Sequence, residues 1–132
     1  MQKTFYLSLP DPKSLQEKLS KTEGVINTEI GYINGLTLYP SKADVDNGKS
    51  GHAYAIKITY DDSLTALQTI LAKFLTYIDP YLPKGEKKMP TRAGFYYTNL
   101  LDGMDADSFF SSSLHEGWNI EVVKMMNFFL AK

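Results

Sequence analysis

The chain has 132 residues, 43% of them hydrophobic, and its 14 Lys and Arg residues nearly balance 15 Asp and Glu residues. This length and hydrophobic content predict a single domain over residues 1–132 with one sizeable core. The net charge of −1 argues against a dedicated binder of nucleic acid or of an anionic membrane surface. No apolar run approaches the roughly 20 residues of a membrane-spanning helix. The absence of cysteine excludes disulfides, thiolate metal sites and thiol nucleophiles from this sequence.

The N-terminal residues indicate a first strand. Residues 4–9 are β-prone, and residues 1–9 carry one Lys and only a short apolar patch, so they lack the pattern of a secretory signal peptide. Together with the absence of cysteine, this favours a cytoplasmic location.

A helix start signal follows this strand. Asp11 is suited to accept a hydrogen bond from a free backbone N–H, and Pro12 at the first helical position lacks an N–H that would need a partner. Leu15 and Leu19, four residues apart, give this helix an apolar stripe. Gly24 then ends the helix.

The middle of the chain alternates between strand, loop and helix signals. Residues 25–38 predict a strand that its glycines bend or break, and residues 39–51 predict a long polar surface loop. Residues 52–60 alternate as a strand with one buried face. Asp62 or Ser63 is then expected to cap a second helix. Its apolar residues follow the helical period: Leu64, Leu67, Ile70, Leu71, Phe74 and Ile78.

The last third contains a basic loop over residues 82–91 and a final strand over residues 92–98. After a variable region, residues 119–131 are apolar on much of a helical circumference and are predicted as a helix. The expected order is β-α-β-β-α-β with a C-terminal helical extension. We therefore predict an α/β (α+β) fold, a ferredoxin-like two-layer α/β sandwich with two helices on one face of a four-stranded sheet.

A series of glycine and aromatic motifs runs through this pattern. In order, they are Gly31-Tyr32, Asn34-Gly35, Gly48-Lys49-Ser50-Gly51-His52-Ala53 and Arg92-Ala93-Gly94-Phe95-Tyr96-Tyr97. The series resembles the A-type peptide methionine sulfoxide reductases, whose final strand reads Arg-Ser-Gly-aromatic-Tyr-Tyr. The resemblance covers about residues 4–98 and leaves residues 99–132 as a variable segment. It implies a two-layer α/β sandwich.

The resemblance also locates the position of the family's nucleophile. Family members carry a Cys at the first strand–helix turn, where the helix dipole lowers the thiol pKa and the thiolate attacks the sulfoxide sulfur. Without a gap, this Cys falls on Asp11, and the Phe and Trp that follow it fall on Pro12 and Lys13. A carboxylate cannot replace the thiol, because the nucleophile must itself be oxidised at sulfur.

The family's other chemical positions are replaced as well. The carboxylate that follows its Gly-His-Ala motif and protonates the sulfoxide oxygen falls on Tyr54. Its two oxygen-binding tyrosines fall on Lys42 and Thr91. We therefore expect no catalytic residue of the reductase in this chain, which is predicted to be an inactive homologue.

The altered pocket predicts binding of a peptide or a small, anionic ligand. The basic residues Lys13, Lys42, Lys87, Lys88 and Arg92 come from separate segments, and the resemblance implies that several of them converge near the N-terminus of the first helix. Asp44 and Asp46 lack the spacing and the terminal Glu of a calcium loop, so they predict a turn. We expect no metal and no cofactor. The expected ligand-binding residues are Lys13, Lys42, His52, Tyr54 and Arg92.

Two other functions compete with this binding module. His52 and Tyr54 alternate onto one strand face and would suit a proton-transfer pair in an enzyme of different chemistry. Alternatively, the C-terminal helix would bind a protein partner such as a true reductase. Structural roles also compete at single residues, since Asp11 suits a helix cap and His52 suits a hydrogen-bonded scaffold position.

Overall fold

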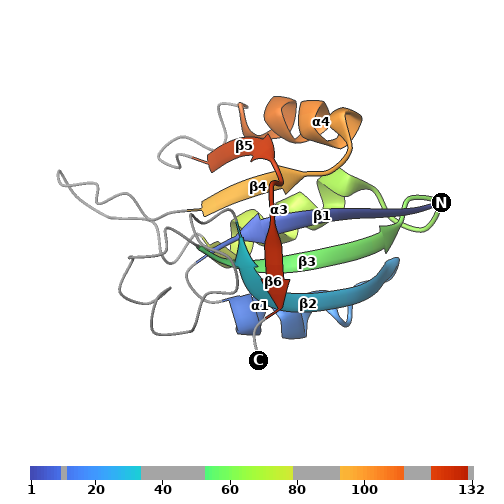
Figure 1. Cartoon of the computed structure of the whole chain (residues 1–132). Helices are drawn as coiled ribbons and strands as arrows, with labels where there is room; N and C mark the ends of the chain where they lie inside the picture. The colour runs from blue at the N-terminus through green and yellow to red at the C-terminus, as the bar shows by residue number, and fades with distance from the viewer. Residues whose placement is uncertain (10–11, 34–52, 79–92, 112–119, 131–132) are drawn as a thin grey trace, which may run out of the picture.

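The computed structural model describes residues 1–9, 12–33, 53–78, 93–111 and 120–130. Its first six elements have the predicted order β-α-β-β-α-β. No helix within these residues is long and apolar enough to cross a membrane. The elements are β1 (Gln2–Ser8), α1 (Pro12–Leu19), β2 (Val25–Ile33), β3 (Ala53–Asp61), α3 (Leu67–Ile78), β4 (Ala93–Tyr97), α4 (Leu100–Phe110), β5 (Ile120–Lys124) and β6 (Phe128–Leu130) (Figure 1).

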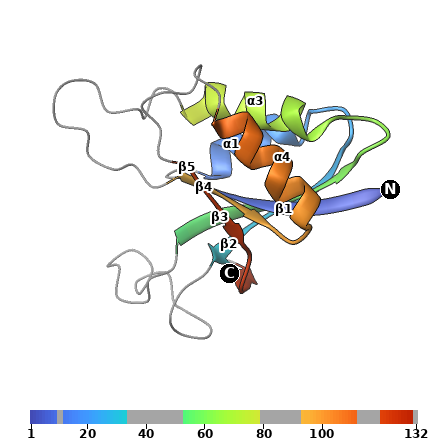
Figure 2. The same ribbon diagram turned by 90° about the horizontal axis from the view of Figure 1, so that it is seen from above.

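The strands form one six-stranded sheet in the order β5-β4-β1-β3-β2-β6. Each neighbouring pair in the row β4-β1-β3-β2-β6 is antiparallel. The edge strand β5, in contrast, runs parallel to its neighbour β4. Parallel neighbours need a long crossover connection, and α4 lies in that connection here. All three helices lie on the same face of the sheet (Figure 2). The fold is therefore a mixed α/β arrangement of one helical layer on one sheet.

The main core lies between the sheet and the helices. Alternate residues of the central strands point into it, because successive side chains of a strand face opposite sides. Phe5 stacks on Phe95 with the ring centroids 5.1 Å apart. Burial of each large apolar side chain contributes about 1.5–3 kcal/mol to stability. The fully buried side chains include Phe5, Leu7, Leu15, Leu19, Ile56, Ile58, Ile70, Leu71, Phe74 and Phe95.

The opposite face of the sheet carries a smaller cluster. Tyr6, Ile33, Ala55 and Tyr96 are buried there, and the Tyr6 ring centroid lies 5.0 Å from that of Phe128 in β6. The segment that leads into β6 crosses this face in front of the strands in Figure 1. It therefore covers residues that would otherwise face solvent. Burial raises the pKa of Tyr6, and Glu29 adds to this increase.

The predicted C-terminal helix over residues 119–131 is wrong. The structure has two strands there, β5 and β6, and its third helix is α4. Three β-branched residues, Ile120, Val122 and Val123, favour a pleated strand, and β5 gains a ladder of hydrogen bonds with β4. The four expected strands form the centre of the sheet in the order β4-β1-β3-β2, and β5 and β6 extend it to six strands, with three helices among the described residues. The partner contact expected through a C-terminal helix therefore has no helix to use, because residues 120–130 form two strands.

Two predicted boundaries also differ from the structure. Asp61 accepts hydrogen bonds from the backbone N and Oγ of Ser63 at 2.9 and 2.6 Å, so this segment forms a turn before α3 begins at Leu67. The first helix ends at Leu19, and Gly24 instead serves the turn into β2. Its φ of 88° lies in the left-handed region that favours glycine.

The strand β2 passes through a glycine of the predicted segment 25–38. It continues through Gly31 to Ile33, although glycine was expected to bend or break it. The reason is the close approach of β6. A Cβ at Gly31 would overlap the carbonyl oxygen of Phe129 and the ring of Phe128. Glycine is needed here for packing and not for a break in the strand.

Candidate functional site

The register of the sheet brings the segments with predicted site residues to one end. Ser8, at the end of β1, pairs with Ala55 and with Gly94. In the same way, Ile33 at the end of β2 pairs with Ala53 at the start of β3. This end therefore combines the carboxyl ends of β1 and β2 with the amino ends of β3, β4 and β5. The helix α1 follows β1 from the same end.

Three of the predicted site residues are described by the structure: Pro12, Lys13 and Tyr54. Three of the remaining residues adjoin described ones in the chain, since Asp11, His52 and Arg92 directly precede Pro12, Ala53 and Ala93. The proposed lysine cluster and the His52–Tyr54 pair therefore remain predictions. The predicted residues that lie outside the described part of the chain are Asp11, Lys42, His52, Lys87, Lys88, Thr91 and Arg92.

The N-terminus of α1 forms one wall of this end. The helix begins at Pro12, as predicted, and Pro12 is buried. Leu15, which is fully buried, fixes the first turn against the core. The first turn contains no acidic residue, and the side chain of Lys13 is exposed. Because the first N–H groups of a helix carry partial positive charge, this wall favours an anion.

Tyr54 lies near the start of β3, on the strand face that also carries Ile56. It pairs with Tyr32 of β2, and the two rings have centroids 5.5 Å apart at an interplanar angle of 57°. Tyr32 is only 5% exposed, whereas Tyr54 is half-buried. A phenolic hydroxyl can donate and accept a hydrogen bond, while an ionised carboxylate only accepts. The position at which the family resemblance places a carboxylate is thus occupied by Tyr54, which has an aromatic ring and a hydroxyl.

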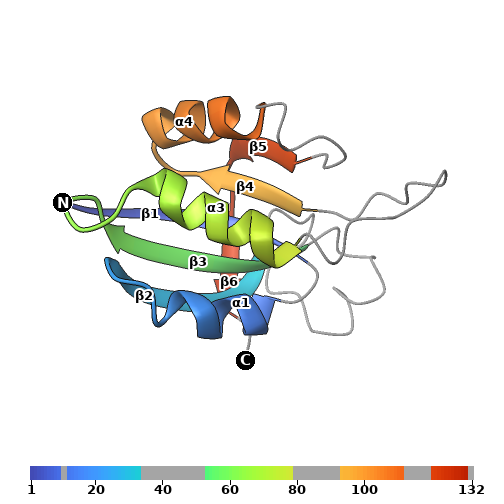
Figure 3. The ribbon, with the colours of Figure 1, turned by 180° about the vertical axis from the view of Figure 1, so that it is seen from behind.

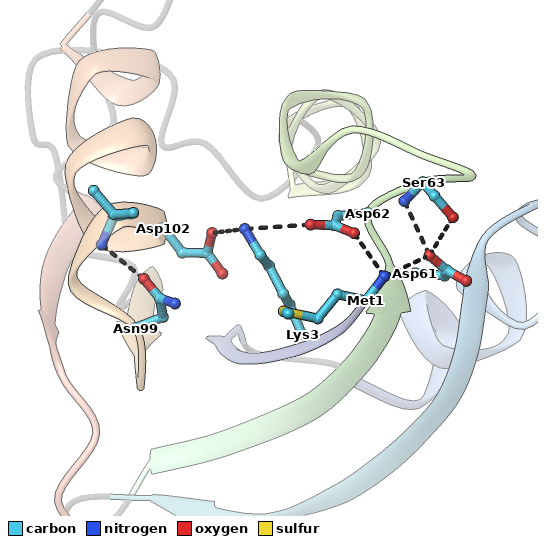
Figure 4. A network of polar contacts seen from close by, with 8 residues as sticks. Met1, Lys3, Asp61, Asp62, Ser63, Asn99 and Asp102 are labelled. Carbon is cyan, nitrogen blue, oxygen red and sulfur yellow. Dashed lines mark hydrogen bonds and ion pairs between the residues drawn. The ribbon is translucent and has the colours of Figure 1, made fainter.

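The other end of the sheet holds a polar network that the sequence analysis missed (Figure 4). Lys3 Nζ lies 3.5 Å from Asp62 Oδ2 and 3.7 Å from Asp102 Oδ1, so it connects β1 to the turn that follows β3 and to α4. The N-terminal ammonium group of Met1 lies 3.0 Å from Asp62 Oδ1. The network lies far along the strands from the predicted pocket and ties three elements together.

Asp102 is the least exposed carboxylate of this network. Its side chain is 3% exposed, and Oδ2 has no hydrogen-bond partner among the described residues. Burial raises the pKa of Asp102, and the charge of Lys3 opposes this increase only in part. Burial also raises the pKa of the neighbouring Tyr60, and the Asp102 carboxylate adds to that increase. At the exposed Asp61, in contrast, the Ser63 hydroxyl lowers the pKa.

A sequence signal could have located this network in part. Asn99 caps α4, because its Oδ1 accepts a hydrogen bond from the Leu101 backbone N at 2.8 Å. An acidic residue three positions later, Asp102, completes a helix-start signature. The burial of Asp102 has no such signal, since it depends on contact with β1. Within the described residues, no three His, Asp or Glu side chains gather closely enough to hold a metal ion.

Comparison with known proteins assigns the family. The family model described as peptide methionine sulfoxide reductase matches residues 14–131, which is most of the chain. This chain belongs to the peptide methionine sulfoxide reductase A family. It is 34% identical over 108 residues to the reductase of Clostridium botulinum (strain Hall), a match that spans 80% of this chain and 67% of the relative. It is 33% identical over 124 residues to that of Clostridium tetani, a match that spans 89% and 76%.

Solved structures of the reductase family share the fold. Methionine sulfoxide reductase A of Corynebacterium diphtheriae superposes with a TM-score of 0.81 at 15% identity, covering 99% of this chain and 70% of that one. Reduced Mxr1 from Saccharomyces cerevisiae gives a TM-score of 0.78 at 18% identity, covering 99% and 80%. The family resemblance predicted from the motifs is thereby confirmed. The sequence of this chain contains no cysteine.

Proposed function

We propose that this chain is a catalytically inactive member of the reductase family that acts as a binding or regulatory module. The observation that carries the proposal is the absence of cysteine from all 132 residues. The residue directly before the first residue of α1, where the resemblance places the nucleophile, is Asp11. Reduction of a sulfoxide by a thiol transfers the oxygen to the nucleophile and forms a sulfenic acid. A carboxylate has no sulfur that could be oxidised in this way.

The altered end of the sheet supports binding of a peptide or a small anionic ligand. The N-terminus of α1 and the exposed Lys13 supply positive potential. The rings of Tyr32 and Tyr54, which contact each other at a tilt, supply an aromatic surface beside the strand ends. In this proposal, the ligand contacts Lys13 and Tyr54, and Lys42, His52 and Arg92 complete its binding site.

A combined activity and binding experiment tests both halves of this proposal. Reduction of free and peptidyl methionine sulfoxide is measured with dithiothreitol as the electron donor, and the reductase of Clostridium tetani serves as the positive control. We expect no turnover above the buffer blank. Turnover by the purified chain would refute the proposed inactivity.

Binding is measured on the same sample by thermal shift. The panel contains methionine sulfoxide, amino acids, inorganic phosphate and small carboxylates. We expect one of these classes to raise the melting temperature, and we expect Lys13→Gln to reduce that increase. The matched control Lys21→Gln removes an exposed lysine beyond the other end of α1 and should leave the increase unchanged. If no compound raises the melting temperature at millimolar concentration, the binding half of the proposal is wrong.

A further inference from the structure

A groove of about 300 Å³ lies between α1 and α3 in the helical layer. Its lining combines apolar surface with two cations: Leu15, Lys18, Ala72, Lys73 and Thr76. The two helices lie side by side on the same face of the sheet in Figure 3. The groove is separate from the binding site proposed above, because none of its lining residues belongs to the set assigned there.

The two lysines of the groove are held by neutral partners. Lys73 Nζ donates a hydrogen bond to Thr22 Oγ1 at 3.3 Å. The same hydroxyl donates to the backbone oxygen of Lys18 at 3.2 Å and so connects the two helices. Lys18 Nζ lies 5.2 Å from the ring centroid of Tyr77, a cation–π contact. Both ammonium groups are therefore positioned without using a carboxylate.

Among the described residues, no acidic side chain neutralises the positive charge of the groove. Within the described part of the chain, no ion pair within 4.0 Å involves Lys18 or Lys73. The helix α3 contains no acidic residue. In α1 the acidic residue is Glu17, which lies about 200° around the helix axis from Leu15 and so faces away from the groove. An anion in the groove would meet two cations and no opposing carboxylate on either helix.

We propose that this groove binds a small amphiphilic anion. Its carboxylate or phosphate group would lie between Lys18 and Lys73, where charge-assisted hydrogen bonds are stronger than neutral ones. Its short apolar chain would lie along Ala72 and the aliphatic stems of the two lysines. The volume suits a small molecule, since ligand pockets begin at about 300 Å³.

Titration of the labelled full-length chain, followed by amide NMR, tests the proposal. The probes are octanoate and octyl phosphate, which carry both features, octanol, which lacks the charge, and acetate, which lacks the apolar chain. We expect saturable shifts at Leu15, Ala72 and Thr76 with the first two probes. Octanol and acetate should bind about tenfold or more weakly, a difference of about 1.4 kcal/mol. The stronger of the two octyl probes identifies the preferred head group.

Three variants separate this site from general attraction of anions. We expect Lys18→Gln and Lys73→Gln each to weaken octanoate binding about tenfold, whereas Lys21→Gln, outside the groove, leaves it unchanged. The proposal is overturned if octanoate gives no saturable shift, if octanol binds as tightly, or if the three variants lose affinity equally. Tighter binding of a Glu-rich peptide than of octanoate would also overturn it, because the occupant would then be a protein.

Discussion

The charge of the Asp102 side chain is favoured by its position in α4 and disfavoured by its burial. Its position in the first turn of α4 suits a negative charge, because it lies near the positive end of the helix dipole. However, only 3% of the side chain is exposed, and the one described cation near it, Lys3, is 3.7 Å away from Oδ1. The raised pKa of Asp102 shows that the cost of burying the charge exceeds these benefits.

Replacement of Lys3 should therefore act mainly through Asp102. We expect Lys3→Met to lower the free energy of unfolding by about 1–3 kcal/mol at pH 7, because it leaves a buried carboxylate without its cation. In the Asp102→Asn background the same replacement should cost much less, since only the exposed contact with Asp62 is then lost. Denaturant unfolding of the four proteins measures this coupling. Equal costs in both backgrounds would show that Lys3 and Asp102 do not interact.

The pH dependence of Asp102→Asn should reveal the same carboxylate. The raised pKa means that the folded state binds the proton of Asp102 more tightly than the unfolded state does. Its contribution to stability is thus complete below the unfolded pKa of about 3.9 and is lost as the pH rises through the folded pKa. We expect the Asn variant to be at least as stable as the parent at pH 7, with an advantage that disappears on acidification. The expectation would be contradicted if the stability of the variant relative to that of the parent were lower at pH 7 than at pH 3.

Elements at the sheet edges depend on close backbone contact. The short strand β6 pairs with the end of β2, and its residue Phe128 covers Tyr6 on the open face of the sheet. This contact is possible because Gly31 has no side chain at the point of closest approach. Three paired residues alone would form a weak strand, so the packing of Phe128 must hold it in place.

Addition of one methyl group at Gly31 should detach β6. We expect Gly31→Ala to cost about 1–3 kcal/mol of stability and to expose the Tyr6 cluster, because the Cβ would overlap Phe129 and Phe128. Amide hydrogen exchange at Ile33 and Leu130 measures the loss of pairing. Gly94→Ala is the matched control, since its Cβ would meet only the side chain of Tyr96, at 3.1 Å. If both variants keep the protection of Leu130, close packing at Gly31 does not hold β6.

At the scale of the whole molecule, titrating groups at the Lys3 end of the sheet act in opposite directions. Asp102 has a raised pKa, whereas Asp61 has a lowered one, chiefly because the Ser63 hydroxyl donates to its carboxylate. A lowered pKa stabilises the fold above the unfolded value of about 3.9, and the stabilisation is lost as the pH falls through the folded pKa. Acidification therefore removes the contribution of Asp61 while it relieves the cost at Asp102.

Ser63→Ala should separate these two effects. The variant keeps the backbone N–H that Asp61 accepts but loses the hydroxyl at 2.6 Å. We expect the variant to be less stable than the parent at pH 7. The two should be equally stable at a pH below the pKa values of Asp61 in the folded and in the unfolded state. In the control Ser20→Ala, the lost hydroxyl bonds the backbone oxygen of Glu17, so its effect should not depend on pH. A loss for Ser63→Ala that is the same at both pH values would exclude the carboxylate as its cause.

Local patterns predicted much of the fold and part of the site. The helix start at Pro12 depends on residues that are adjacent in sequence. The alternation that predicted β3 reflects a single strand with one buried face. The position of Tyr54 in β3 followed from the same pattern, whereas its place at the altered end of the sheet was implied by the family resemblance. Its ring contact with Tyr32 did not, because that contact depends on the register between two strands that residues 34–52 separate in sequence.

The sequence by itself determined the family and the absence of a thiol nucleophile, because the motifs and the missing cysteine can be read without coordinates. Only the tertiary structure decided the state of residues 120–130. Their apolar pattern is compatible with a helix or a strand, and pairing of β5 with β4 and of β6 with β2 selects the strand. It also decided the burial of Asp102 and the groove between α1 and α3. Each arises where segments distant in sequence meet, and no local pattern encodes the energy of such a contact.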